Sequence, residues 1–451
     1  MERRKFVKDS MLATAAFSII PAARLMANEE KKVRIAQFGV GLRGQAHLEN
    51  FLHRSDVEIV AICDVDERML GMASDIIKKS GKPMPQIFRG DSYAYKKLLE
   101  FKNIDGVVIA TPWEWHTPMI IDSLQAGIKY VGTEVILGIT LDDHWKVVHE
   151  AEKQKANVMM LENACYFRDV LAVLNMVRQG VFGELIHLQC GYQHDLRGVK
   201  FNNGIEPYDS GVEFGEKAFS EARWRTNHSV HRNGDLYPTH GVGPVATMID
   251  INKGNRFLSL NSFATKTRGL HDYIVKKGGE NHPNAKVKFK LGDIVTTQIN
   301  CANGETILIQ HDTNLPRPYS LGYRVQGTKG LWMQVNHSVY VEDVSEKHKW
   351  DDEKAWLEKY DHPLWKRWAT KDTEGAAGHG GIDFFVLHGF VEAMKRRVAT
   401  PLDVYDAAAW SAITPLSETS LELGNETVDF PDFTSGQWMY RKNNFVTTDA
   451  Y

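Results

Sequence analysis

The chain has 451 residues, which is long enough for two domains that each bury a sizeable core. Its 54 lysine and arginine residues nearly balance its 57 aspartate and glutamate residues, giving a net charge of −3. This balance argues against nucleic acid or another polyanion as a partner. The four cysteines, Cys63, Cys165, Cys190 and Cys301, form no C-x-x-C pair. Because Cys63 and Cys190 lie in apolar, strand-like runs, we expect buried thiols rather than a disulfide framework.

The first residues are typical of an export signal. Basic residues at 2–8 precede an apolar run, Met11–Pro21, and the small Ala27 stands before an acidic pair. The adjacent Arg3 and Arg4 resemble the twin-arginine signal of bacteria, which exports folded proteins. We therefore predict a signal peptide over 1–27, a periplasmic or secreted protein, and no membrane insertion after its removal, since the run is short for a bilayer. The alternative is an amphipathic N-terminal helix of the mature protein.

A nucleotide-binding fingerprint follows directly. The apolar strand Val33–Phe38 runs into a G-x-G-x-x-G loop formed by Gly39, Gly41 and Gly44, and Asp64 ends the next strand, Val57–Ile62. The glycines allow a tight turn and a close approach to pyrophosphate, while the following helix N-terminus offers free N–H groups. Asp64 can accept hydrogen bonds from a ribose and would repel a 2′-phosphate. The fingerprint therefore predicts an NAD site.

Strands and helices continue to alternate up to Leu161. We predict helices over Glu67–Lys79, Tyr93–Phe101, His116–Ala126 and Leu141–Lys155, and strands over Ile104–Ala110, Lys129–Glu134 and Ala156–Leu161. This alternation indicates an α/β fold, a Rossmann doubly wound parallel sheet, over 31–163. Ligands of such sheets bind at the carboxyl ends of the strands, where the chain places Gly39–Gly44, Asp64, Thr111–His116, Glu134, Glu162 and Asn163.

The second half, 164–451, changes character near Glu162–Arg168. We predict strands over Leu185–Tyr192, Phe257–Thr265, Val287–Lys290, Ile294–Cys301, Thr306–His311, Arg324–Gly327, Leu331–Gln334 and Ser338–Glu342, and late helices over Gly381–Arg397 and Val404–Leu423. This order indicates an α+β domain with a large, mostly antiparallel sheet. One sheet face would pack on helices and the other would suit a ligand or a homodimer. The segment Gly234–Gly241 is expected to open a helix at the nicotinamide end of the cleft.

These motifs resemble the Gfo/Idh/MocA family of NAD(P)-dependent oxidoreductases. The resemblance rests on Gly39–Gly44, Cys63–Asp66, Thr111-Pro112 with His116, and the strand-end Glu134. Most members carry Glu-Lys-Pro where this chain has Glu134-Val135-Ile136. The family lysine helps to move the hydroxyl proton during hydride transfer, so its absence argues against an ordinary dehydrogenase.

Further residues resemble one branch, glycoside hydrolase family 109, over nearly the whole chain after the signal. The most specific block is Tyr237–Pro244; the other matching motifs are Arg43-Gly44 with His47, Trp113–His116, Thr133–Val135, Glu162-Asn163 with Tyr166, Trp224-Arg225, and Tyr319 with Gly322-Tyr323. That family comprises NAD-dependent α-N-acetylgalactosaminidases, often exported by the twin-arginine route. The resemblance implies a glycan or glycoconjugate containing N-acetylgalactosamine as substrate. Ile136 departs from the proline of the family.

The resemblance also implies a redox-neutral mechanism. A conventional glycosidase needs two carboxylates that flank the scissile bond, and no spacing in this chain singles out such a pair. In the family, oxidation of the sugar at C3 acidifies the C2 proton, the aglycone is eliminated from C1, water adds, and C3 is reduced again. NAD would therefore be tightly bound and recycled, and the protein would position groups and move protons.

Carried over residue by residue, the family pattern implies two sets of contacts. The NAD contacts would be Leu42, Arg43, Asp64, Trp113, Glu114, Trp115, His116, Glu134, Val135 and Asn163. The substrate contacts would be Tyr192, Arg225, Tyr237, Pro238, Thr239, His240 and Tyr319.

Three residues are our candidates for catalysis. His240 is the leading base for the C3 hydroxyl, because an imidazole accepts protons near neutral pH. Tyr237 would assist, and Glu134 would serve the cofactor or a proton relay. Tyr192 and Tyr319 are candidates for the C2 proton, although tyrosines are also common at core edges.

Several of these residues also have an ordinary structural explanation. Arg225 could form an ordinary salt bridge, and His228 with His231 lacks a third ligand at metal-site spacing, so we predict no metal. The tryptophans of a charged stretch could form a sugar-stacking lid, an interdomain contact or a dimer contact: Trp350, Trp356, Trp365 and Trp368. Two rival functions remain, an NAD-dependent sugar dehydrogenase and a non-catalytic NAD-binding sensor.

Overall fold

The first half of the chain forms a six-stranded parallel sheet. The structure is a computed structural model that describes residues 32–369 and 381–451, so the predicted signal over 1–27 lies outside the described residues. The strands follow the order β3-β2-β1-β4-β5-β6, and every neighbouring pair is parallel. They are β1 (Val33–Phe38), β2 (Val57–Cys63), β3 (Gln86–Phe88), β4 (Gly106–Ile109), β5 (Tyr130–Thr133) and β6 (Asn157–Met160). The doubly wound sheet predicted from the alternating pattern is confirmed.

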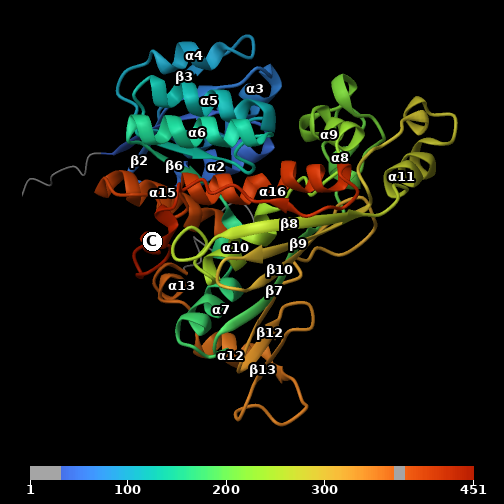
Figure 1. Cartoon of the computed structure of the whole chain (residues 1–451). Helices are drawn as coiled ribbons and strands as arrows, with labels where there is room; N and C mark the ends of the chain where they lie inside the picture. The colour runs from blue at the N-terminus through green and yellow to red at the C-terminus, as the bar shows by residue number, and fades with distance from the viewer. Residues whose placement is uncertain (1–31, 370–380) are drawn as a thin grey trace, which may run out of the picture. The chain divides into compact units, whose positions relative to one another are not determined.

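Helices cover both faces of this sheet (Figure 1). They are α2 (Leu42–Leu52), α3 (Glu67–Ser80), α4 (Ala94–Leu99), α5 (Trp113–Gln125) and α6 (Leu141–Gln154). The predicted start of the third helix at His116 is wrong, because Pro112 is the N-cap and Trp113 already begins α5. Since the strand order reverses between β1 and β4, the carboxyl ends of these two strands flank a crevice where dinucleotides bind in such folds.

The second half forms a nine-stranded sheet in the order β14-β13-β12-β11-β7-β10-β9-β8-β15. Among the strands of the described residues, only β7 and β10 pair in parallel within this sheet, so the prediction of a mostly antiparallel sheet is confirmed. The strands are β7 (Leu185–Gln193), β8 (Phe257–Ala264), β9 (Ile294–Cys301), β10 (Thr306–Asp312), β11 (Arg324–Gly327), β12 (Gly330–Met333), β13 (Ser338–Val341), β14 (Asp351–Asp352) and β15 (Val428–Asp429).

One predicted strand, Val287–Lys290, is wrong. The residues before it form the 3-10 helix η5 (Pro283–Lys286), and Val287–Lys290 follow without pairing to a sheet strand. Phe289 packs instead in a small aromatic cluster with Phe201 and Tyr273. The alternating pattern there reflects burial beside a helix rather than a place in the sheet.

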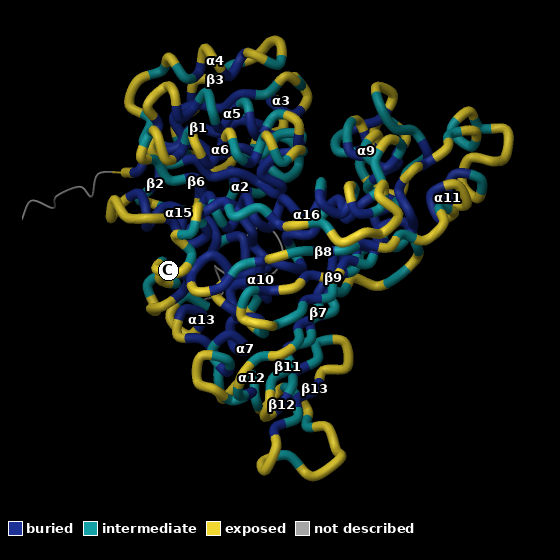
Figure 2. Tube along the Cα trace, viewed as in Figure 1, coloured by how far each residue is buried: buried dark blue, intermediate teal, exposed yellow. Residues whose placement is uncertain are grey.

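The helices of the second half pack on the larger sheet and also return to the first one. They are α7 (Arg168–Arg178), α8 (Arg197–Lys200), α9 (Arg225–His231), α10 (Thr239–Met248), α11 (Gly269–Gly278), α12 (Glu353–Lys359), α13 (Pro363–Trp368), α15 (Ile382–Arg396) and α16 (Val404–Glu422), with the 3-10 turns η2 (Asn163–Tyr166), η3 (Gly215–Lys217), η4 (Ser220–Arg223) and η7 (Gln437–Met439). Helix α16 contacts β8 on one side and α6 and β6 on the other. Figure 2 shows α16 largely buried between the two sheets, as expected of a helix that is apolar on most sides.

The tryptophan-rich stretch divides between interior and surface. Trp365 is buried, and its Nε1–H donates to the carbonyl of Tyr166 at 2.8 Å. Trp368 packs on His388 of α15, whereas Trp350 is half exposed. Two of the four tryptophans therefore hold C-terminal helices in place, which favours the packing interpretation over a lid.

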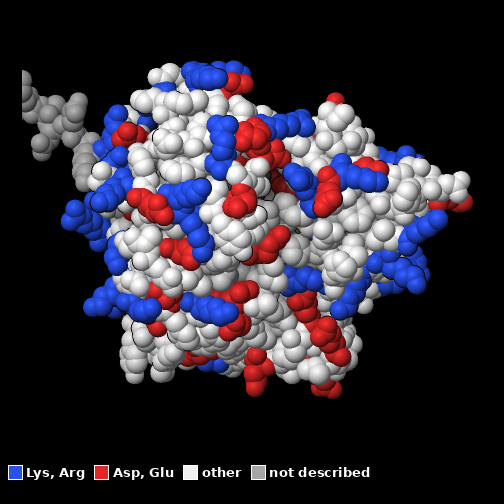
Figure 3. Space-filling model, turned by 90° about the horizontal axis from the view of Figure 1, so that it is seen from above, with Lys and Arg blue, Asp and Glu red and all other residues white. Residues whose placement is uncertain are grey.

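The cysteines and the charged surface side chains agree with the expectations from composition. All four cysteines are free and buried, so the expected buried thiols are confirmed. Basic and acidic side chains are interspersed on the face shown in Figure 3. Among the described residues, no helix combines the length and the apolar character that a bilayer crossing requires.

A close approach between α10 and β7 sets the position of the predicted base. A Cβ on Gly241 would lie 2.7 Å from the backbone nitrogen of Gly191, so only glycine lets the helix approach the strand this closely. This contact brings His240, one residue before Gly241, beside Tyr192 of β7, with ring centroids 5.3 Å apart.

Gly241→Ala is expected to destabilise the protein by about 1–3 kcal/mol and to lower activity, because overpacking would push α10 away from β7. Gly71→Ala in α3 is the matched control, since its Cβ would meet nothing within 4 Å. That change should be neutral or stabilising by up to about 1 kcal/mol. Thermal unfolding and steady-state kinetics of both variants check this, and equal behaviour of the two would refute the packing argument.

Candidate active site

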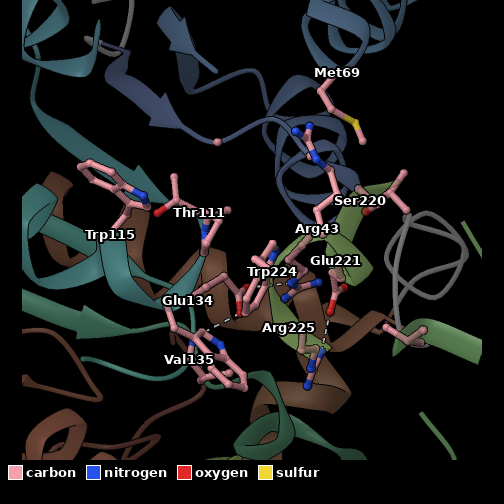
Figure 4. Close-up of a pocket in the computed structure, with 18 of the residues that line it drawn as sticks. Arg43, Met69, Thr111, Trp115, Glu134, Val135, Ser220, Glu221, Trp224 and Arg225 are labelled. Atoms are coloured by element: carbon pink, nitrogen blue, oxygen red, sulfur yellow. Dashed lines mark hydrogen bonds and ion pairs between the residues drawn. The ribbon is translucent and has the colours of Figure 1, made fainter. Parts of the chain in front are cut away.

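A cavity of about 840 Å³ opens at the carboxyl edge of the parallel sheet. Its size is within the range of small-molecule sites. One wall comes from the ends of β1, β2, β4 and β5, and the opposite wall from β7, η4, α9 and α10. Figure 4 shows side chains of both walls turned toward the same space. The structure thus brings together residues that are up to about 200 positions apart in the sequence.

The glycine-rich loop forms a cradle at this edge. Gly39 has φ +82°, and a Cβ there would lie 2.3 Å from the carbonyl oxygen of Ala110. A Cβ on Gly44 would lie 2.2 Å from the carbonyl oxygen of Gly39, so this glycine allows α2 to pack on the loop. Gly41 instead faces open space in the cavity wall and leaves the N-terminus of α2 without a side-chain cap. This arrangement fits a pyrophosphate.

Asp64 lies at the next strand end and is fixed by backbone donors. The N–H of Val40 donates to Oδ2 at 2.7 Å, and the N–H of Asp66 donates to Oδ1 at 2.9 Å. Burial raises the pKa of Asp64 above its ordinary value. Because each carboxylate oxygen can accept more than one hydrogen bond, Asp64 can still accept from a ribose. The loop and this carboxylate together fit an adenine dinucleotide.

An ion-pair network closes the inner end of the cradle. Arg43 donates to Glu134 at 2.7 Å and, through both terminal nitrogens, to Asp383 of α15 at 2.7 and 2.9 Å. His47 donates to the same Glu134 oxygen at 2.6 Å, and Asn163 donates to Asp383 at 2.7 Å. Burial alone would raise the pKa of Glu134, but Arg43 and His47 outweigh it and hold that pKa far below its ordinary value.

A carboxylate that is paired this well is a weak proton acceptor. The geometry therefore favours a binding role for Glu134 at the cofactor over the proton relay that we predicted as its alternative. The predicted contacts that line the cavity with it are Gly39, Gly41, Leu42, Arg43, Asp64, Trp113, Trp115, Val135 and Asn163.

Three predicted cofactor contacts, Glu114, His116 and Gly44, lie outside the cavity lining. His116 is fully buried, and its ring nitrogens lie 2.5 Å from the carbonyl oxygen of Ile136 and 2.8 Å from that of Thr111. It thus ties the ends of β4 and β5 together. Glu114 faces His228 at 3.8 Å. Gly44 serves the packing described above.

His240 is oriented by a buried carboxylate. Glu162 follows β6, has no exposed side-chain surface, and accepts from Nδ1 of His240 at 2.6 Å. The carboxylate also accepts the N–H of Ala164 at 3.1 Å, which fixes its position. Because Nδ1 carries the proton in this pair, Nε2 is the ring nitrogen that can accept one. An imidazole held in this way is suited to act as a general base at the cavity.

Aromatic side chains surround this imidazole. The ring of Tyr192 lies 4.5 Å from that of Tyr237 and 5.3 Å from that of His240, measured between centroids. Burial raises the pKa of Tyr192 to about 12 and that of Tyr237 well above its ordinary value, so both remain protonated near neutral pH. They can therefore donate hydrogen bonds to a bound substrate.

Arg225 lies over the same aromatic group. Its guanidinium carbon is 4.8 Å from the ring centre of Tyr237 and 5.4 Å from that of Trp113. Nη1 also pairs with Glu221 at 2.5 Å, which Figure 4 shows as a dashed line. The ordinary salt bridge that the sequence analysis allows for Arg225 is therefore present. Arg225 also lines the cavity.

The remaining predicted substrate contacts lie at the margin. Pro238 and Thr239 are buried at the start of α10, outside the cavity lining, and Tyr319 is half exposed against His194, 4.9 Å between ring centres. The sequence analysis places Glu162 at the ligand edge of the sheet without a catalytic role, and it does not single out His194, Glu221 or Asp383. The position of Glu162 directly after a strand was the one usable signal, while Asp383 is brought in by a helix 220 positions from Asn163.

Asp235 is an unusual carboxyl beneath the site. It is buried, Oδ1 accepts the N–H of Tyr237 at 3.1 Å, and Oδ2 is among the buried oxygens without a partner in the described part of the chain. Burial raises its pKa to about 7. The loop that leads to Tyr237 is therefore built around a carboxyl that resists ionisation.

Comparison with known proteins accounts for both halves of this cavity. Residues 33–162 match the oxidoreductase family with an NAD-binding Rossmann fold, and residues 166–440 match the C-terminal domain of glycosyl hydrolase 109. A glycosyl hydrolase family 109 protein of Stenotrophomonas maltophilia is 58% identical over 100% of this chain and 99% of its own. An alpha-N-acetylgalactosaminidase of Tannerella forsythia is 52% identical over 92% of this chain and 89% of its own.

The fold also occurs among solved structures. Levoglucosan dehydrogenase in complex with NADH superposes with a TM-score of 0.64 at 18% identity, over 89% of this chain and 100% of that chain. At this identity the likeness shows the shared fold alone.

Glu162→Gln is expected to lower kcat about 100-fold with little change in KM, because the amide keeps the shape but no longer stabilises a protonated His240. Glu353→Gln is the matched control. Glu353 accepts from His337 at the same 2.6 Å and also from the indole of Trp332, at the start of α12 and outside the lining of this cavity. Steady-state kinetics of both variants check this, and an active Glu162→Gln enzyme would exclude the dyad.

Asp235→Asn is expected to become more stable relative to the parent as pH rises. The folded-state pKa of about 7 lies above the ordinary value of 3.8, so ionisation of the unfolded chain weakens folding of the parent across this interval. The difference should approach zero near pH 4 and reach up to about 4 kcal/mol near pH 8. Urea unfolding of both proteins across this range measures it, and a difference independent of pH would contradict the assignment.

Proposed function

The chain belongs to glycosyl hydrolase family 109, and we propose that it releases terminal α-N-acetylgalactosamine from glycans or glycoconjugates with NAD as a recycled cofactor. The observation that carries the proposal is the His240–Glu162 pair facing an NAD-type cradle across one cavity. The name of the Tannerella forsythia relative supplies the sugar.

Two carboxylates of the cavity lining, Glu134 and Glu221, support a redox route over direct displacement. A displacing glycosidase needs a carboxylic acid that stays protonated beside the scissile bond. Glu134 is kept ionised by Arg43 and His47, and Glu221 is paired with Arg225. Neither is placed as a proton donor to a leaving group.

The cofactor would be held by the Gly39–Gly44 loop, by Asp64 and by the Arg43–Glu134 pair. When bound, NAD would accept a hydride from the sugar and later return it, so that no net oxidation results. Val135 lines the cavity where related dehydrogenases carry their catalytic lysine, and its apolar side chain can move no proton. The transfer of the C3 hydroxyl proton therefore falls to His240.

His240 would take the proton of the C3 hydroxyl at Nε2 and return it at the end of the cycle. The proton on Nδ1 stays hydrogen-bonded to Glu162, and the charge of this carboxylate stabilises the imidazolium that exists between the two proton transfers. With a carbonyl at C3, the C2 proton becomes acidic and the aglycone at C1 can leave by elimination. Water then adds at C1.

Tyr192 and Tyr237 would donate hydrogen bonds to oxygens that gain charge during elimination, because burial keeps both phenols protonated. Arg225 would hold the N-acetyl carbonyl or a ring hydroxyl as a fixed donor.

The export prediction fits this chemistry. An enzyme that regenerates its NAD in every turnover needs one cofactor per protein molecule, loaded where NAD is made. We propose that the chain folds and binds NAD before twin-arginine export to the periplasm or beyond. The support for this step is the sequence of residues 1–27.

The redox route predicts that N-acetylgalactosamine released in D₂O carries deuterium at C2, because the C2 proton is removed and replaced from solvent. Mass spectrometry or NMR of the released sugar measures this, with His240→Ala and an enzyme-free incubation as controls. Sugar released without deuterium would indicate direct displacement. No release, with NADH formed from free sugar, would indicate a dehydrogenase.

A further inference from the structure

A segment of the second half reaches across the adenosine end of the cavity. This segment, residues 202–223, contributes Tyr208, Asp209, Ser220 and Arg223 to the lining. The parallel-sheet side of the same opening is lined by Asp64, Asp66, Asp91 and Ser92. The end of the cavity where Asp64 would hold a ribose is therefore enclosed by two separate parts of the fold.

The segment has a firm base on its own side. Asn202, fully buried, donates to the carbonyl of Phe219 at 2.7 Å and accepts the N–H of Phe219 at 2.9 Å. Its backbone also exchanges hydrogen bonds with Glu213 at 3.1 and 2.8 Å. At the other margin, the N–H of Asp209 donates to Gly198 at 3.1 Å. The two ends of the segment are thus pinned together.

Two arginines join the segment to the parallel-sheet side of the cavity, one arginine from each side. Arg68 of α3 donates to the carbonyl of Ile205 at 2.8 Å, and its guanidinium carbon lies 4.0 Å from the ring centre of Phe219. In the opposite direction, Arg223 of η4 donates to Asp66 at 3.2 Å. Asp66 is the N-cap of α3 and stands two residues after Asp64. The contact is therefore immediately beside the ribose position.

The contacts of the two arginines are more exposed to solvent than the buried hydrogen bonds of Asn202 at the base of the segment. The Arg223 side chain is 48% exposed and that of Asp66 is 23% exposed, so the ion pair is open to solvent and can break without loss of core packing. Bonds of this sort can release while Asn202 still holds the segment together.

We infer that Arg68 and Arg223 latch the segment 202–223 over the adenosine end of the cavity and set the rate at which NAD leaves. The inference rests on the proposed function, in which one cofactor molecule must survive many turnovers. It adds a residue-level cause for retention: the cofactor cannot withdraw past α3 until both arginines let go.

The test is the rate of NAD loss, measured without any glycoside. Protein loaded with isotopically labelled NAD is mixed with excess unlabelled NAD, and the label that stays with the protein is followed over time. Arg68→Ala/Arg223→Ala is expected to lose NAD about tenfold faster than the parent, since it removes an exposed ion pair and a cation–π contact. An unchanged rate overturns the latch.

Arg89→Ala is the matched control. Arg89 forms an exposed ion pair with Glu67 at 3.1 Å within the parallel-sheet half, so its removal should leave the rate of NAD loss unchanged. An equal acceleration in this control would mean that lost surface charge, and not the latch, governs release, which also overturns the inference.

A second variant and a salt series test the latch even if the double variant fails to fold. Asp66→Asn keeps an oxygen to cap α3 but removes the charge opposite Arg223. NAD loss should accelerate in it, and the parent should lose NAD faster as salt is added, because screening weakens an exposed pair. If neither occurs, the latch is excluded. Because the readout needs NAD binding but no hydrolysis, failure of the proposed glycosidase activity would leave these rates interpretable.

Discussion

The hydrogen bond between Glu162 and His240 joins the two halves of the cavity. Glu162 follows the last strand of the parallel sheet, while His240 opens α10 on the second sheet, and their atoms meet at 2.6 Å with the carboxylate fully buried. A buried charge is tolerated only when it is well paired, so this contact constrains how α10 approaches β6. The absence of a Cβ on Gly241 then permits the approach of α10 to β7. The same contact also holds the imidazole of His240 in the cavity lining, with Nδ1 on Glu162.

A second polar network holds the elements on the cofactor side of the cavity together. Arg43 lies between Glu134 and Asp383 and thereby ties the glycine-rich loop, the end of β5 and helix α15 into one unit. Charge is fixed in this network, since Glu134 stays ionised, whereas the tyrosines around His240 stay protonated. The cavity therefore separates side chains that hold charge from side chains that stay protonated. This separation fits the recycled cofactor that we propose.

Sequence reasoning worked where the determining interactions are local. The strand, loop and helix from Val33 through Gly44 could be located because glycine geometry and apolar runs act within a few residues. It failed at Val287–Lys290, where tertiary packing of Phe289 produced a strand-like pattern. Resemblance located the cavity residues around Arg43 and His240 but not the more distant residues that they contact. Asp383, Glu221 and the Arg68 and Arg223 contacts depend on how distant elements meet, and no spacing in the sequence carries that information.

The central claim is that hydrolysis proceeds through NAD that is bound and regenerated within the protein. The most direct test is turnover of 4-nitrophenyl N-acetyl-α-D-galactosaminide by the purified protein with no cofactor added, while nitrophenol and NADH are followed together. We predict many equivalents of nitrophenol per protein with no net NADH, and loss of release in His240→Ala. Stoichiometric accumulation of NADH, or undiminished release after NAD has been stripped from the protein, would contradict the account.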